Sequence, residues 1–352
     1  MDRALLDALL SHLSQSAKVP REVWSSLLAL TGEQERGYVA SIAREVRERN
    51  FGGGVYVRAL LEITSYCRNG CRYCGLRAPN SAAERYRLSK EEILNSCSRA
   101  AELGFKTFVL QGGEDTAFTD DWLTGLVQEI HSRHPAVAIT LSLGERSALS
   151  YERLYAAGAC RYLLRHEAAD NCLYSRLHPS AMSPDRRKEA LFNLKSIGYQ
   201  TGSGMMIGVP GQRTEHIVED MLFLDELRPQ MIGIGPFVPA SGTPFASEKA
   251  GSVRDTIFLI SLLRLRFPRA LIPATTALAT LSATGTEDAI LAGANVVMPN
   301  VTPLQYGKKY AIYDNKKICG SESASELLLL ERKLGAIGCH IDYGRGDYTP
   351  VA

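Results

Sequence analysis

Short apolar runs alternate with amphipathic segments along most of the chain. Each apolar run is bounded by turn residues, which predicts a strand buried within a parallel sheet. The segments between the runs carry helix-start signals, and Ser89 followed by Glu92 fits a capping box at the start of one of them. The expected strands are residues 57–66, 107–112, 138–143, 161–166, 200–207, 231–237, 271–277 and 296–299.

Eight such β/α units in roughly 250 residues predict an α/β fold with a closed (β/α)8 barrel of the TIM type. A doubly wound open sheet is the alternative, but it seldom needs so many uninterrupted parallel units. In a barrel of this kind the chemistry belongs at the carboxyl ends of the strands. Polar residues that directly follow the expected strands are therefore the first candidates for a site.

Both ends of the chain depart from the β/α pattern. Leu5, Leu6, Leu9, Leu10 and Leu13 share one helical face, and residues 38–48 predict a second helix before the glycines at 52–54. After about residue 320 we expect one helix, residues 326–334, and a glycine-rich tail. The predicted division is an N-terminal helical extension (1–50), the barrel (51–320) and a short C-terminal segment (321–352).

Composition and charge narrow the classes of function. The chain has 352 residues, of which 40 are Lys or Arg and 38 are Asp or Glu, so the formal net charge is only +2. This balance argues against a nucleic-acid partner or binding to an anionic membrane. No apolar run approaches the roughly 18 residues of a membrane helix. The leucine-rich start is interrupted by Asp7 and His12 and makes a poor signal peptide. We therefore expect a soluble, cytoplasmic protein.

Three of the eight cysteines are crowded into one short stretch. Cys67, Cys71 and Cys74 have the spacing C-x3-C-x2-C directly after the first expected strand, whereas the other five are scattered. In a chain of this kind a tight triplet indicates metal or redox chemistry rather than disulfides. A structural zinc site would need a fourth ligand, and none follows nearby. A 4Fe-4S cluster takes four ligands, so three cysteines leave one iron open for a small molecule.

The triplet resembles the signature of the radical S-adenosylmethionine (SAM) superfamily, in which an aromatic residue precedes the last cysteine, as Tyr73 does here. The resemblance implies that the open iron binds SAM and that electron transfer cleaves it to a 5′-deoxyadenosyl radical. Residues 112–114 resemble the superfamily's GGE motif, and Glu167 and Arg187 resemble residues that contact SAM. Read alone, each would be a turn or a solvated charge. The SAM-binding residues implied are Tyr73, Gln111, Gly112, Gly113, Ser142, Glu167 and Arg187.

Longer strings resemble one branch of that superfamily, the HydE family of FeFe-hydrogenase maturases, which is close to methylornithine synthase and biotin synthase. They include residues 161–167 (RYLLRHE) and 232–237 (IGIGPF), and the resemblance runs from about residue 57 to 319. It implies a substrate inside the barrel, a cysteine-bound iron carbonyl cyanide complex supplied by a partner maturase. Read alone, Thr275 and Thr276 would be β-branched residues that fill a strand, and Met298 would be ordinary core packing. The implied cavity residues are Thr140, Arg165, Thr275, Thr276, Met298, Tyr310 and Tyr313.

The sequence departs from some family members near its end. Cys319 stands at the first position of an accessory cluster, but residues 321–331 contain no cysteine, and Cys339 is too far along the chain to replace one. We therefore expect a single 4Fe-4S cluster, with Cys319 and Cys339 structural or free. The expected partners are a reductant such as ferredoxin or flavodoxin, a small organometallic or amino-acid substrate, and other hydrogenase maturases.

Several alternatives stay open at this point. Sulfur insertion of the biotin synthase type is disfavoured because the strands at 138–143 and 161–166 contain no cysteine. A mutase resembling methylornithine synthase, or a HydE-like paralogue with another small substrate, would use the same scaffold. A non-catalytic iron–sulfur scaffold would explain the cysteines but not the other strand ends. A zinc-dependent β/α hydrolase is weaker, because His166 alone does not supply a metal site.

Overall fold

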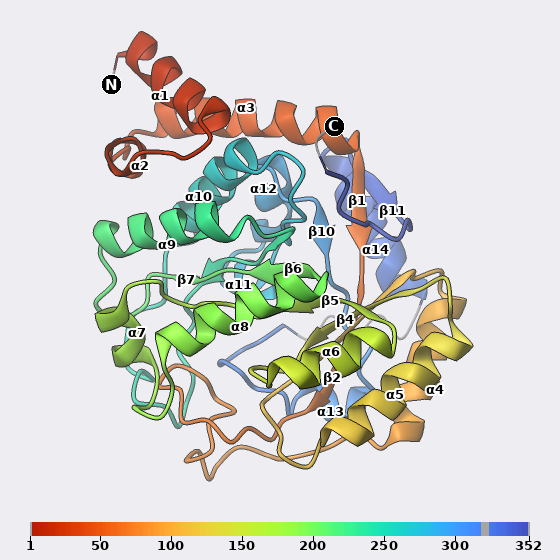
Figure 1. The fold of residues 1–352 in the computed structure, drawn as a ribbon. Coiled ribbons are helices and arrows are strands. Elements are labelled where there is room, and N and C mark those ends of the chain that lie inside the picture. The colour runs from red at the N-terminus through yellow and green to blue at the C-terminus, as the bar shows by residue number, and fades with distance from the viewer. Residues whose placement is uncertain (1, 318–323, 351–352) are drawn as a thin grey trace.

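The computed structural model describes residues 2–317 and 324–350 and contains a parallel barrel surrounded by helices (Figure 1). The strands are β1 (Gly54–Val57), β2 (Ala59–Thr64), β3 (Thr107–Gly112), β4 (Ala138–Ser142), β5 (Ala159–Leu163), β6 (Gln200–Ser203), β7 (Met206–Ile207), β8 (Met231–Ile232), β9 (Gly235–Pro236), β10 (Val296–Val297) and β11 (His340–Asp342). The helices are α1 (Arg3–Gln15), α2 (Arg21–Leu28), α3 (Glu33–Phe51), α4 (Lys90–Glu102), α5 (Asp120–Arg133), α6 (Ala148–Ala156), α7 (Asn171–Leu177), α8 (Pro184–Ile197), α9 (Thr214–Leu227), α10 (Val253–Arg266), α11 (Thr276–Leu281), α12 (Gly285–Leu291), α13 (Leu304–Gly307) and α14 (Ala324–Ala336).

The barrel closes through both long ladders and single bridges. Six strands pair in the order β2-β3-β4-β5-β6-β8, all in parallel. Isolated bridges continue the wall from Met231 to Leu271 and from Pro273 to Val296, and Leu60 pairs with Asn300 to complete the circle. The closed barrel is thereby confirmed and the open sheet is excluded. The expected strand 271–277 is wrong in extent, because only these bridges form and the chain turns into α11 at Thr276.

Two expected strands are each split at a glycine. The run 200–207 separates into β6 and β7, and the run 231–237 into β8 and β9. At the first break Gly204 has φ +156°, and a Cβ there would come within 1.9 Å of the Gly233 carbonyl oxygen. Only glycine allows the two backbones to approach so closely. Gly233 and Gly235, at the second break, line the cavity described below.

Alternate residues of each strand face opposite sides of the barrel wall. On β3, Phe108 and Leu110 belong to the hydrophobic core between the sheet and its helices, whereas Gln111 lines the internal cavity. The helix α4 begins with the expected capping box, since Ser89 accepts from the Glu92 backbone and the Glu92 side chain accepts from the Ser89 N–H. Local sequence signals therefore fix both the helix starts and the two faces of the wall.

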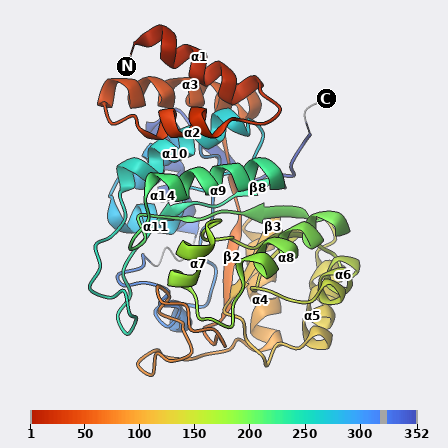
Figure 2. The same ribbon diagram turned by 60° about the vertical axis from the view of Figure 1, so that its left-hand side comes forward.

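The N-terminal region is mainly helical, as expected, and its helices α1 to α3 pack on the outside of the barrel beside α9 and α10 (Figure 2). A buried ion pair anchors them. Arg266 of α10 pairs with Asp225 of α9. It also donates to the backbone carbonyls of Leu13, near the end of α1, and of Ser16 and Ala17, which follow that helix. This junction is tied into the barrel by charge as well as by apolar packing.

The C-terminal segment contains the expected helix, α14, and a strand that the sequence pattern did not predict. The strand β11 pairs in parallel with β1, with Gly54 opposite His340. Figure 1 shows β11 beside β1. The division of the chain at residues 50 and 320 stays a prediction. In the described residues, no helix is both long enough and apolar enough to cross a membrane.

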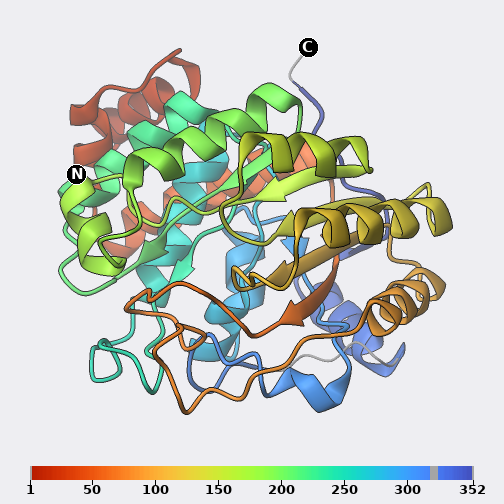
Figure 3. The ribbon, with the colours of Figure 1, turned by 60° about the horizontal axis from the view of Figure 1, so that its bottom comes forward.

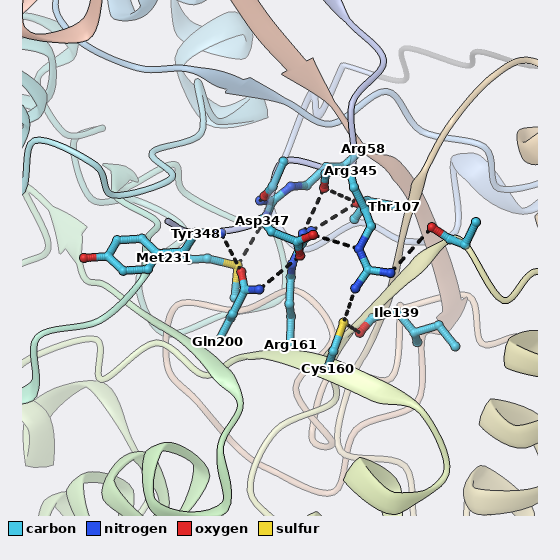
Figure 4. Close-up of polar contacts among 12 residues, drawn as sticks. Arg58, Thr107, Ile139, Cys160, Arg161, Gln200, Met231, Arg345, Asp347 and Tyr348 are labelled. Carbon is cyan, nitrogen blue, oxygen red and sulfur yellow. Dashed lines mark hydrogen bonds and ion pairs between the residues drawn. The ribbon is translucent and has the colours of Figure 1, made fainter. Parts of the chain in front are cut away.

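Beyond β11 the tail covers two buried arginines at the amino-terminal end of the barrel, which we call the barrel floor (Figure 4). Arg161 is fully buried and donates to Thr107, to the Arg345 carbonyl oxygen and, at 2.7 Å, to the Asp347 carboxylate. Arg58 lies beside it, and burial followed by the charge of Arg161 lowers its pKa well below the ordinary value. Asp347 is therefore the carboxylate that compensates this buried positive charge.

Replacement of Asp347 with Asn is expected to lower the free energy of unfolding by about 3 kcal/mol, because Arg161 would lose its counter-ion. The estimate is at the lower end for a buried pair because the Asp347 side chain is 42% exposed. Urea denaturation would measure the loss. The control is Asp121→Asn, which removes an ion pair whose carboxylate is 88% exposed and should cost less than about 1 kcal/mol. Equal effects of the two substitutions would contradict the assignment.

The same contact predicts a dependence on pH. Hydrogen bonds from Arg161 and its positive charge outweigh burial and lower the pKa of Asp347 to about 2. Because the pKa is lowered on folding, the stabilisation is complete above the ordinary carboxyl pKa of about 4 and is lost as the pH falls toward 2. Acid titration of the wild type and of Asp347→Asn should therefore converge in stability below about pH 2 and diverge above it.

Candidate functional site

A cavity of about 340 Å³ opens at the carboxyl end of the barrel, the end that Figure 3 turns toward the viewer. Residues expected from the sequence to bind a cluster, SAM or substrate line it together. They are Cys67, Cys71, Tyr73, Cys74, Gln111, Gly112, Gly113, Ser142, Arg165, Glu167, Arg187, Thr275, Thr276, Met298, Tyr310 and Tyr313. Thr140 is the exception, because it does not line this cavity, and its role in substrate binding stays a prediction. It lies two positions before Ser142 on β4, deeper in the barrel, and its buried hydroxyl has no partner.

The three cysteines lie on the loop that follows β2. Arg85 holds this loop in shape, because its guanidinium donates to the carbonyl oxygens of Ser65, Leu76, Arg77 and Asn80 at 2.6 to 3.2 Å. Further backbone bonds tie the loop to residues outside it, from Arg68 to Glu114 and from Gly75 to Ile312, both at 2.9 Å. The sequence pattern gave no reason to assign Arg85 this role.

Replacement of Arg85 with Ala should therefore loosen the cysteine loop. Four hydrogen bonds from a charged donor would be lost, and we expect the free energy of unfolding to fall by roughly 3 kcal/mol. Iron bound after reconstitution should fall as well, because the thiols would no longer be held in place. Arg68→Ala is the matched control, since Arg68 is on the same loop but its side chain is 57% exposed. Iron analysis and thermal unfolding would measure both losses, and Arg68→Ala should show neither. Equal losses in the two variants would contradict this role of Arg85.

The thiols suit a cluster better than a single metal ion. All three line the same cavity, and burial followed by the nearby Cys74 and Cys67 sulfurs raises the pKa of Cys71. Burial also raises the pKa of Cys74 to about 12. Within the described part of the chain, however, no three His, Cys, Asp or Glu side chains are gathered closely enough to hold one ion. In a 4Fe-4S cluster each thiolate binds a different iron, which fits three sulfurs that share a cavity without converging.

Two glycines at the end of β3, Gly112 and Gly113, allow the cysteine loop to pass close to the sheet. A Cβ at Gly113 would come within 2.2 Å of the Tyr66 carbonyl oxygen and 2.6 Å of the Cys67 Cβ. A Cβ at Gly112 would come within 2.8 Å of the Thr64 side chain. A side chain at Gly113 would push the loop away, and a side chain at Gly112 would press on Thr64 of β2, so the two glycines set how closely the cysteine loop and β2 approach β3.

Two ion pairs at the cavity are joined by a hydrogen bond to the backbone. Arg165 donates to Glu167 at 2.6 and 3.1 Å, and Arg187 donates to the Arg165 carbonyl oxygen at 3.0 Å and pairs with Glu145. Burial lowers the pKa of Arg165, but the Glu167 carboxylate outweighs it and the net shift is upward. Glu167 has φ +65°, a strained conformation for a residue with a side chain. The sequence pattern did not single out Glu145.

Tyr73 packs edge-on against the ring of His178, which stacks on Tyr174. The His178 Nδ1 atom lies 3.0 Å from the Tyr174 carbonyl oxygen, which can only accept, so the proton is on Nδ1. The Nε2 atom must then accept from the Tyr73 hydroxyl at 3.3 Å. Burial lowers the pKa of His178 to about 4, which keeps the ring neutral near pH 7. His178 was also missed, because a lone histidine carries no sequence signal.

His166, by contrast, packs against α9 and does not line the cavity. Its ring contacts Ser203 at 2.9 Å and Asp220 at 3.2 Å, and Asp220 also accepts from the Ala169 N–H. This buried, fully engaged histidine offers no open position for a metal. The zinc-hydrolase alternative loses its one candidate ligand.

Comparisons with known proteins agree with this geometry. The family model described as the radical SAM superfamily matches residues 61–224. The chain is 42% identical to the FeFe hydrogenase maturase subunit HydE of Thermotoga maritima over 85% of both chains. It is 31% identical to the 3-methylornithine synthase of Methanosarcina acetivorans over 77% of both chains. The solved structure of methylornithine synthase (PylB) superposes with a TM-score of 0.82 at 26% identity, covering 95% of this chain and 97% of that one.

Proposed function

Because this chain belongs to the radical SAM superfamily, in the group that includes HydE and 3-methylornithine synthase, we propose that it is an FeFe-hydrogenase maturase of the HydE type. As a radical SAM enzyme it uses a 4Fe-4S cluster and SAM. Its proposed substrate is a cysteine-bound iron carbonyl cyanide complex, the precursor of the diiron subcluster. The observation that carries the proposal is the cavity, in which the cysteine loop and Arg165 share one enclosed space.

Cys67, Cys71 and Cys74 would hold the single cluster, which leaves one iron for SAM. Bound together, the cluster and SAM supply the radical that starts the reaction. Cys339 does not support a second cluster, because its thiol is buried against Arg47. Cys319 lies outside the described residues. Gly112, Gly113, Ser142, Glu167 and Arg187 would bind SAM, and Tyr73 would pack beside it.

Arg165 would recognise the substrate. Its guanidinium faces the cavity and is paired with Glu167, so an anionic group on the substrate would have to share or displace that carboxylate. Thr275, Thr276, Met298, Tyr310 and Tyr313 would complete the enclosure. A cavity inside the barrel limits the access of water and stray hydrogen donors to radical intermediates.

The second candidate is a mutase of the methylornithine synthase type, which the overall superposition with that structure favours. Sulfur insertion has less support. In the described part of the chain, Cys160 lies on the barrel floor near Arg345, and Cys172 is exposed on α7, so neither reaches the cavity.

Two assays separate these functions. The reconstituted protein, with a ferredoxin or flavodoxin as reductant and the partner maturases present, should support maturation of an apo-hydrogenase. The same preparation should leave lysine unchanged. Conversion of lysine to methylornithine without maturation would replace the maturase proposal with the mutase proposal.

A further inference from the structure

A segment that we call the strap, residues 308–317, follows α13 and forms part of the wall of the cavity. Four of its side chains line the cavity: Tyr310, Ile312, Tyr313 and Lys316. The segment has no helix or strand of its own, so its position depends on contacts with the elements around it.

The strap is held at its edges by backbone contacts. The Ile312 carbonyl oxygen accepts from the Gly75 N–H at 2.9 Å, and Asp314 bonds to Pro239 and Ser241. The fit to the cysteine loop is close, since a Cβ at Gly75 would come within 2.1 Å of the Ala311 carbonyl oxygen. Movement of the strap would therefore disturb the loop that carries the three thiols.

A buried ion pair connects the strap to strand β2 of the barrel wall. The Lys316 side chain is 8% exposed and pairs with Glu62 of β2, whose side chain is fully buried. The second Glu62 oxygen accepts from Asn300 at 2.9 Å, and the Glu62 N–H donates to Thr302 at 2.8 Å. The Lys316 ammonium also lies 4.9 Å from the centre of the Tyr310 ring. The pair thus connects the strap to two parts of the barrel wall.

Such a pair is a poor choice for stability alone. Removing two charges from water costs about as much as their attraction returns, and apolar side chains of similar size are often at least as stable. Buried charge pairs do, however, define one arrangement of the segments that they join. At this place the arrangement decides where Tyr310 and Tyr313 stand relative to the cavity.

We propose that the Lys316–Glu62 pair is the latch of the strap and that Lys316 is a positioning residue. It holds the strap closed over the cavity and thereby fixes Tyr310 and Tyr313 in the cavity wall. Entry and release of the substrate then require the pair to separate. This role concerns the mouth of the cavity and does not depend on which substrate the enzyme uses.

Limited proteolysis of the full chain tests the latch without any substrate. Trypsin can cut after Lys308 and Lys309, at the start of the strap. Lys316→Met should raise the rate of cleavage there at least about tenfold, because a buried pair is broken. Lys316→Arg should stay close to the wild type. Lys317→Met is the matched control, since this neighbouring lysine is exposed, and it should change nothing.

The double variant Glu62→Gln/Lys316→Met distinguishes a latch from general destabilisation. It removes the uncompensated buried carboxylate, so its midpoint of thermal unfolding should recover. Its strap should still be cut rapidly, because the latch is missing. If cleavage returned to the wild-type rate together with the unfolding midpoint, or if Lys316→Met never accelerated cleavage, the latch would be refuted.

A kinetic measurement adds a readout that rests on the proposed function. In the maturation assay, Lys316→Met should raise the apparent KM for the substrate more than it lowers kcat, because the strap would be open more often. Lys316→Arg should restore the KM. Failure of wild-type maturation would count against the proposed function and leave the proteolysis result untouched.

Discussion

Replacement of any one of Cys67, Cys71 or Cys74 with Ala is expected to abolish the 4Fe-4S signal and with it all cleavage of SAM. Three thiols leave one iron open, so a site that loses one of them retains too few protein ligands to hold the cluster. The loss should be nearly complete because the other described cysteines do not reach the cavity. Iron analysis, electron paramagnetic resonance of the reduced protein and 5′-deoxyadenosine release would measure it.

The matched controls are cysteines elsewhere in the chain. Cys172→Ala changes an exposed thiol on α7, and Cys339→Ala changes a buried thiol that contacts Arg47, so neither should alter the iron content. Cys319→Ala should also leave the iron nearly unchanged. Loss of a second cluster's worth of iron in that variant would overturn the prediction of a single cluster.

The barrel could be predicted because buried parallel strands leave a local record in the sequence. The weakest prediction concerned 271–277, where Pro273 lacks the N–H that a ladder needs, so that only bridges form. The strand β11 has three residues and no apolar run, and it pairs with β1 from the opposite end of the chain. Nothing near it in the sequence indicates that partner.

The candidate site was predictable only in part, for a similar reason. The cysteine spacing is a local signal, and three thiols in one loop are brought to one cavity by the loop itself. The ion pairs are not local. Arg187 finds Glu145 at a distance of 42 residues along the chain, and Lys316 finds Glu62 at 254. Read one at a time, such charges look like solvated surface residues, and only the folded barrel places them together.

The sharpest test of the substrate site is Arg165→Ala, which should cripple maturation while SAM is still cleaved. An anionic substrate held by this half-buried arginine should lose roughly 2–5 kcal/mol of binding free energy when the arginine is removed. SAM binding should survive, because the open iron, Arg187 and the glycines after β3 stay in place. Release of 5′-deoxyadenosine would then continue without productive turnover.

The structure adds one complication, which a second variant resolves. Arg165 also pairs with Glu167, so the Ala variant leaves a largely buried carboxylate without its cation and could weaken SAM binding indirectly. Arg165→Lys keeps the charge beside Glu167 but cannot form two parallel bonds to a planar anion. If Arg165 acts on the substrate, the Lys variant should bind SAM normally and still mature poorly. Should the Lys variant mature the hydrogenase at the wild-type rate while the Ala variant loses SAM cleavage, Arg165 would serve Glu167 and not the substrate.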